Sequence, residues 1–112
     1  MSAVELLAHA QQVITGSRAD GLSARMAAFL ARQALEEIIA LRCAALGADV
    51  RRANGRSRLV VLRALDAQET ADGAAVAWSR LSLACHVHAF ELQPSIAEVE
   101  HLCAMVASLL PD

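Results

Sequence analysis

Apolar residues recur along most of this chain at spacings of three and four, the spacing that places side chains on one face of an α-helix. The pattern predicts five helices. The first begins at Ser2 and ends near Gly16, and the last begins at Ser95 and ends at Pro111. Both starts are capping boxes, a serine followed three residues later by glutamate, whose side chains satisfy free amides of the first helical turn.

Three more helices are predicted between them. The second covers residues 22–45, the third begins at a cap at Ser57, and the fourth covers residues 74–92. Gly47 is the expected left-handed stop of the second helix, and the segment 66–73 is expected to be a connection. The third helix is short, with three leucines directed at the core: Leu59, Leu62 and Leu65. The inner face of the fifth is predicted to carry Val99, Leu102, Cys103, Val106, Leu109 and Leu110.

The long second helix has apolar residues on two sides. Met26 and Phe29 share an arc with Arg25, so this helix is expected to be central or to meet another subunit. Arg32 and Glu36 are one turn apart and are expected to form an intrahelical ion pair. The opposite side is a seam that admits close helix packing, formed by Ala27, Leu30, Ala34, Ile38, Leu41 and Ala45.

Composition supports an all-α fold. The chain has 112 residues, 56% hydrophobic and only 3% aromatic, so its interior has to be built from small and aliphatic side chains. We expect one domain over residues 1–112, an up-and-down bundle of four long helices and one short helix. Mean hydropathy is +0.41, yet no apolar run approaches the ~20 residues that span a bilayer. Apolar surface in excess of one core favours a homodimer and no membrane contact.

Charge and cysteine usage exclude several classes of function. The net charge of −2 gives no overall basic field, so any RNA contact has to be local. Cys43, Cys85 and Cys103 lie in apolar patterns without CxxC spacing, which indicates buried, reduced thiols rather than a disulfide framework or a zinc site. Glu5 stands where a signal peptide carries positive charge, so we expect a cytoplasmic protein. No metal or other cofactor is expected.

Arg80 and His86 are the residues most suited to chemistry. Six helical residues separate two side chains by about 120° around the axis and ~9 Å along it, so these two groups do not hydrogen-bond each other. They converge only if two copies of the helix meet across a twofold axis. An arginine binds phosphate through two hydrogen bonds, and a histidine transfers protons near neutral pH.

The second-helix sequence AAFLARQALEEIIALRCAALG, the short third helix and the segment SRLSLACHVHAFEL resemble the HEPN domain superfamily over essentially the whole chain. The resemblance implies a dimeric helical bundle with an arginine and a histidine four to six residues apart, which Arg80 and His86 match. In active members this motif is a metal-independent ribonuclease site at the dimer interface, often in toxins or phage defence. Active members often have a polar residue directly after the arginine, whereas this chain has Leu81.

Other interpretations of these residues remain open. Arg80 is also interpretable as an ordinary surface or interface residue, and His86 as a partner of Ser79 or Ser82. The superfamily includes members that bind RNA or nucleotides without cleaving. The alternative function is therefore a non-catalytic helical dimer that binds RNA, a nucleotide or a protein such as an antitoxin or a nucleotidyltransferase.

Four arginines lie within eight residues before and inside the third helix: Arg51, Arg52, Arg56 and Arg58. Guanidinium groups at this density are able to guide an RNA backbone toward a site. A charged run in a loop is also typical of an ordinary solvated surface.

Overall fold

The computed structural model describes residues 1–16, 21–48, 52–86 and 94–111, and all regular structure in these ranges is α-helical. This confirms the all-helical class and the number of helices. The helices are α1 (Ala3–Gly16), α2 (Gly21–Ala45), α3 (Gly55–Leu65), α4 (Gln68–Cys85) and α5 (Ile96–Ser108). Within these ranges, no helix is long and apolar enough to cross a membrane.

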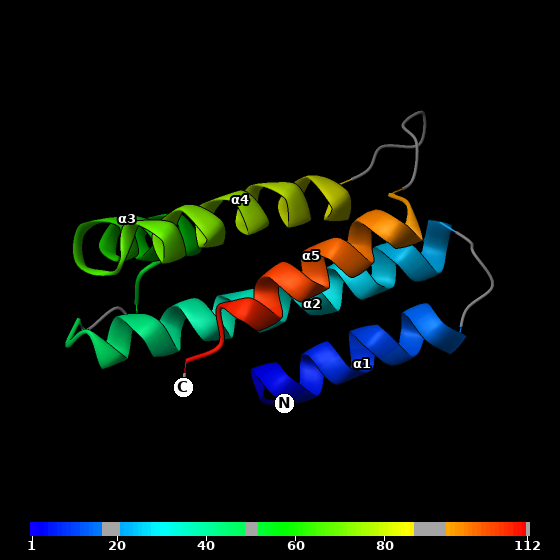
Figure 1. The fold of residues 1–112 in the computed structure, drawn as a ribbon, viewed down its shortest axis with the longest axis horizontal. Helices are drawn as coiled ribbons and strands as arrows, with labels where there is room; N and C mark the ends of the chain where they lie inside the picture. Colours follow the sequence, from blue (N-terminus) through cyan, green and yellow to red (C-terminus); the bar gives the residue numbers. More distant parts are fainter. Residues whose placement is uncertain (17–20, 49–51, 87–93, 112) are drawn as a thin grey trace.

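The α2 helix is the centre of the bundle and contacts each of the other four helices. Figure 1 shows α1 and α4 on opposite sides of α2, with α5 packed alongside α2 and the short α3 beside the first half of α4. The bundle measures 43 × 28 × 24 Å along its principal axes. The central position of α2 explains its buried apolar residues, whereas Met26 and Phe29, on the second apolar side, are 52% and 53% exposed.

Small side chains let α2 approach its neighbours closely. The seam predicted along this helix is only partly right, because Leu41 is 48% exposed and Ala45 is exposed as well. Ala27, Ala34 and Ile38 of the seam are buried as predicted. The buried stripe also includes Leu35, Ile39 and Cys43. Five alanines of the stripe have no exposed surface: Ala24, Ala27, Ala28, Ala31 and Ala34.

The start of α3 differs from the predicted one. Asn54, not Ser57, is the N-cap, and its side-chain oxygen accepts a hydrogen bond from the Ser57 N–H at 2.8 Å. Leu62 is fully buried as expected, but Leu65, the last residue of α3, is 55% exposed. The side-chain amide oxygen of Asn54, three residues before Ser57, therefore caps the first turn of α3 in place of the serine hydroxyl.

The boundaries of α4 also differ from the prediction. The helix begins at Gln68, so most of the expected connection over 66–73 is helical. Ala71 and Ala74 are buried in the core, and this packing holds the first turns of α4 helical in spite of the neighbouring Asp72 and Gly73. The helix ends at Cys85; the predicted continuation to residue 92 falls in the segment 87–93, which lies outside the described residues.

The caps predicted at Ser2 and Ser95 and the stop predicted at Gly47 are confirmed, whereas α5 ends at Ser108, before the predicted end at Pro111. The Ser2 hydroxyl accepts from the Glu5 N–H at 3.2 Å, and the Ser95 hydroxyl accepts from the Glu98 N–H at 3.0 Å. Gly47 has a φ of 81°, the left-handed conformation that ends α2. The inner face predicted for α5 is buried except at its last residue, which is half-buried: Val99, Leu102, Cys103, Val106, Leu109 and Leu110.

Candidate functional site

The two residues that the sequence selects for chemistry lie on the solvent side of α4. Arg80 is exposed in the second half of the helix, and His86 is exposed at its C-cap. The His86 N–H donates to the carbonyl oxygens of Ser82 and Leu83, each at 3.2 Å. These bonds fix the backbone of His86 at the helix end, while its imidazole remains accessible to water.

The residue after Arg80 belongs to the core. Leu81 has no exposed surface and packs with the buried stripe of α4. The burial of Leu81 explains why this position is apolar in the chain. The position after Arg80 therefore offers no polar side chain to a site that includes Arg80 and His86.

Within one chain, Arg80 and His86 flank an exposed strip of α4 and do not converge. Their separation of about 120° on an ideal helix leaves an outer arc between them. On this arc lie Ser79, which is exposed, Val76, which is 41% exposed, and Leu83, which is 71% exposed. We call Val76, Ser79 and Leu83 the α4 strip; it carries two exposed aliphatic side chains and is flanked by the guanidinium of Arg80.

Two arginines of α2 that sequence reasoning did not assign to the site reach the end of α4. The Nη2 of Arg25 donates to the carbonyl oxygen of Cys85 at 3.4 Å, directly before His86. Burial raises the pKa of the Cys85 thiol, and the nearby charges of Arg32 and Arg25 partly oppose that rise. Because a helix C-terminus carries partial negative charge, Arg25 is electrostatically favourable there.

Arg32 lies over the ring of Trp78, with its guanidinium carbon 4.7 Å from the ring centroid. Trp78 also contacts the start of α3, because a Cβ at Gly55 would lie only 2.6 Å from a ring carbon. The indole is therefore held between a helix end and a cation. The intrahelical pair expected for Arg32 and Glu36 is absent from the ion pairs of the described residues, and Trp78 is the partner instead.

Two buried polar atoms near this end of α4 have no hydrogen-bond partner among the described residues: Nε of Arg32 and Oγ of Ser82. The contact proposed from sequence between Ser82 and His86 therefore does not form through this hydroxyl. Unpartnered buried donors are uncommon, since each costs about 1–3 kcal/mol. These two atoms are hydrogen-bonding groups that the described part of the chain does not use.

The sequence did contain a signal for these arginines. Arg25 and Arg32 are seven residues apart, which places them two turns apart on one side of α2. Met26 and Phe29 lie beside them and are 52% and 53% exposed. The side of α2 noted for mixing apolar and charged residues is therefore the side that remains partly uncovered.

The structure describes three of the four arginines predicted to guide RNA. Arg51 lies outside the described residues, and Arg52 is exposed in the turn before α3. Arg56 is exposed and Arg58 is half-buried on α3, two residues apart, so they point to different sides of that helix. Arg58 lies near Cys43 of α2, where its charge opposes the rise that burial causes in the pKa of the thiol.

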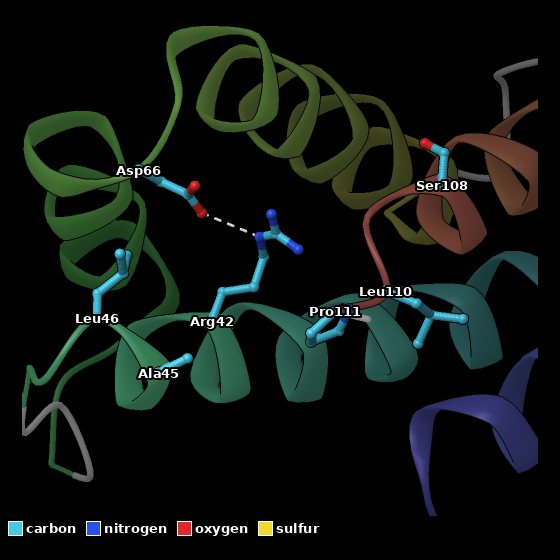
Figure 2. Close-up of a pocket in the computed structure, with 7 residues that line it drawn as sticks. All are labelled: Arg42, Ala45, Leu46, Asp66, Ser108, Leu110 and Pro111. Atoms are coloured by element: carbon cyan, nitrogen blue, oxygen red, sulfur yellow. Dashed lines mark hydrogen bonds and ion pairs between the residues drawn. The ribbon is translucent and has the colours of Figure 1, made fainter.

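At the other end of the bundle, Arg42 links three elements. Its Nε donates to Asp66 at 2.9 Å, and its Nη1 donates to the carbonyl oxygen of Leu109 at 2.8 Å. Figure 2 shows Arg42 reaching from α2 toward Asp66 in the turn between α3 and α4. Arg42 and Asp66 line a cavity of about 310 Å³, together with Ala45, Leu46, Ser108, Leu110 and Pro111. Because both charges are paired, this cavity is best explained as a structural junction.

The three cysteines are free and buried, as the sequence predicted. Burial raises the pKa of Cys103 to about 11 and also raises that of Cys43. A raised pKa leaves little thiolate at neutral pH, so these thiols are poor nucleophiles. The cysteines therefore contribute packing, and the candidate chemistry stays with Arg80 and His86.

Comparison with known proteins adds no relative. No protein-family model, no curated protein and no solved structure matches this chain. The resemblance to the HEPN superfamily stays a prediction from the sequence.

Proposed function

We propose that the chain is a HEPN-like domain that pairs with a second copy through the α4 strip and cleaves RNA without a metal ion, as toxin or defence ribonucleases do. The observation that carries the proposal is that Arg80 and His86 are both exposed on the helix whose outer arc also exposes Val76 and Leu83. An exposed apolar strip flanked by a guanidinium and an imidazole suits a twofold contact to which each copy brings both groups.

Two copies together supply the groups that RNA cleavage requires. The imidazole of one His86 accepts the proton of a ribose 2′-hydroxyl while the 2′-oxygen bonds to phosphorus. The imidazolium of the second His86 donates a proton to the 5′-oxygen as its bond to phosphorus breaks. Arg80 binds the phosphate oxygens and offsets the charge that develops on them. One copy alone provides one His86, so pairing is part of the mechanism.

A second candidate is a helical dimer that binds RNA, a nucleotide or a protein partner without cleavage. The burial of Leu81 favours it, because the position after Arg80 gives the groove no polar group. In this case Arg80 and His86 serve as phosphate-binding residues, and no bond is broken.

Incubation of the purified protein with end-labelled single-stranded RNA in EDTA tests the first candidate. We expect His86→Ala to slow cleavage by about 10²–10⁴-fold, the usual contribution of a general acid or base. Arg80→Ala is expected to slow it by about 10²–10³-fold, as for other lost transition-state donors. His101→Ala removes an exposed histidine of α5 and serves as the matched control, with an unchanged rate.

Leu83→Glu tests the pairing. Because Leu83 is 71% exposed, this change leaves the core intact. We expect a shift from dimer to monomer in light scattering, together with loss of cleavage. Equal cleavage by wild type, His86→Ala and Arg80→Ala, or a monomeric wild type at micromolar concentration, would contradict the proposal. RNA that is retained but uncut by the wild type would support the second candidate instead.

A further inference from the structure

A groove between α3 and α4 lies on a part of the molecule that the proposed function does not use. It has a volume of about 390 Å³ and is lined by five residues of α3 and one of α4: Arg56, Leu59, Val60, Arg63, Ala64 and Ala75. Figure 1 shows α3 lying beside the first half of α4. Ala64 and Ala75 carry only a Cβ each, so they leave the space between the two helices unfilled.

The walls of this groove are apolar and open to water. Val60 is 65% exposed on α3, although its neighbour Leu59 packs against the buried core. The Val60 side chain therefore contributes little to the stability of the fold. A partner that covers Val60 and the exposed part of Leu59 removes apolar surface from water at about 25 cal/mol per Å².

Two guanidinium groups flank the groove on one side. Arg56 and Arg63 are seven residues apart on α3, which places them on the same side of the helix and about 10.5 Å apart along it. The α3 sequence, GRSRLVVLRAL, contains no acidic residue. The Nη2 of Arg63 lies 3.6 Å from the Oδ1 of Asp72 on α4, and these side chains are 68% and 54% exposed. Ion pairs that are this exposed contribute little to stability.

We propose that this groove binds an amphipathic helix of a partner protein. The apolar side of that helix packs on Val60 and Leu59, and acidic residues two turns apart on its flank pair with Arg56 and Arg63. This is the helix-in-groove mode of recognition, in which anchors repeat every three to four residues. Charge complementarity identifies the occupant, because two cations flank the groove and the one carboxylate paired with them among the described residues, Asp72, is an exposed partner of Arg63. The inference does not depend on cleavage of RNA by Arg80 and His86.

RNA fits the groove less well than an acidic helix does. Proteins that hold single-stranded RNA combine basic groups with aromatic side chains on which bases stack. The groove has the basic groups, but no aromatic residue lines it. A phosphate backbone seated here would also lie against the aliphatic side chains of Leu59 and Val60.

The test uses a pair of synthetic peptides. Each is an Ala-based helix of about 16 residues, long enough to form helix in water, with leucines at positions i, i+4 and i+7. One peptide has glutamate two turns apart on the flank of the leucine stripe, and the other has lysine there. Fluorescence anisotropy measures binding to the whole protein, and amide shifts in ¹H–¹⁵N spectra locate it. We expect the glutamate peptide to bind at least tenfold more tightly, with shifts on α3 and α4.

Protein variants make the test specific to the groove. Val60→Asp is expected to weaken binding of the glutamate peptide at least tenfold. Val4→Asp, the control, changes a 61% exposed valine of α1 and is expected to leave this binding unchanged. The double variant Arg56→Glu, Arg63→Glu is expected to reverse the preference, so that the lysine peptide binds more tightly.

Four results would overturn the proposal: no saturable binding of the glutamate peptide, equal binding of both peptides, amide shifts away from α3, or unchanged binding by Val60→Asp. Tighter binding of an RNA oligonucleotide or of anionic vesicles at the same amides would also contradict it. Dissociation of a wild-type dimer by Val60→Asp would assign the groove to a second copy of the chain. Cleavage assays of Arg80 and His86 variants are read separately, so failure of one proposal leaves the other intact.

Discussion

Two arginines of α2 have opposite surroundings, and the contrast separates the two ends of the bundle. Arg42 donates to Asp66 and to the carbonyl oxygen of Leu109, so it ties α2 to the α3–α4 turn and to the end of α5. Arg32 lies on the ring of Trp78, and its buried Nε has no hydrogen-bond partner within the described ranges. Both belong to one helix, so the difference arises from what the other elements bring to each position.

The two ends differ in how the fold uses these arginines. At the Arg42 end, backbone and carboxylate oxygens meet the guanidinium, and the charge is used within the fold. At the Arg32 end, the start of α3 meets Trp78, and the side of α2 that carries Arg25 and Phe29 remains partly exposed. His86 caps α4 at this end.

The largest effect is expected from Arg42→Ala. This change removes two hydrogen bonds and leaves Asp66, whose side chain is only 13% exposed, without its cation. We expect a loss of about 2–3 kcal/mol in the free energy of unfolding, below the value for a fully buried pair because Arg42 is 21% exposed. Urea denaturation followed by circular dichroism measures it. Arg42→Ala combined with Asp66→Ala should lose less than the sum of the single changes; additive losses would mean that the pair is not coupled.

A smaller effect is expected at the contact between α3 and Trp78. Gly55→Ala places a Cβ 2.6 Å from the indole ring, so the ring or the helix has to shift. We expect a loss of about 1–3 kcal/mol, as for other overpacked sites, measured by the same denaturation. Gly16→Ala is the matched control, because nothing lies within 4 Å of that position. In a Trp78→Leu background the cost of Gly55→Ala should vanish; a cost that persists there would place the strain elsewhere.

The smallest effect is expected from Arg32→Met, which keeps an aliphatic stem over Trp78 and removes the guanidinium. The change loses a cation–π contact of about 0.5–1 kcal/mol but also removes a buried donor without a partner. We therefore expect a net change of less than about 1 kcal/mol, and Arg42→Met should cost several times more. Equal losses in the two methionine variants would contradict the contrast between the two ends.

The sequence predicted those features that depend on local chemistry. The caps at Ser2 and Ser95 and the left-handed Gly47 need only a few neighbouring residues, and the structure has all three. The predicted start of α4 was wrong. Asp72 and Gly73 indicate a loop locally, whereas the burial of Ala71 and Ala74 depends on helices that are distant in the sequence. Tertiary packing outweighed local propensity there.

The residues of the candidate site also differ in whether local sequence or tertiary packing reveals them. Arg80 and His86 were identified because they lie six residues apart on one helix, a spacing visible in the chain. Arg25 and Arg32 were not, because their approach to the end of α4 depends on how α2 and α4 pack against each other. Convergence between helices is information that a one-dimensional pattern does not contain.

The position of Trp78 gives the protein an intrinsic optical reporter. The chain has one tryptophan and no tyrosine, so its emission comes from a single ring held between the start of α3 and Arg32. Detachment of α3 would expose that ring to water and shift its emission to longer wavelength, even while the far-ultraviolet signal of the other helices stays constant. Loosening of one short helix can thus be followed separately from global unfolding, without a label.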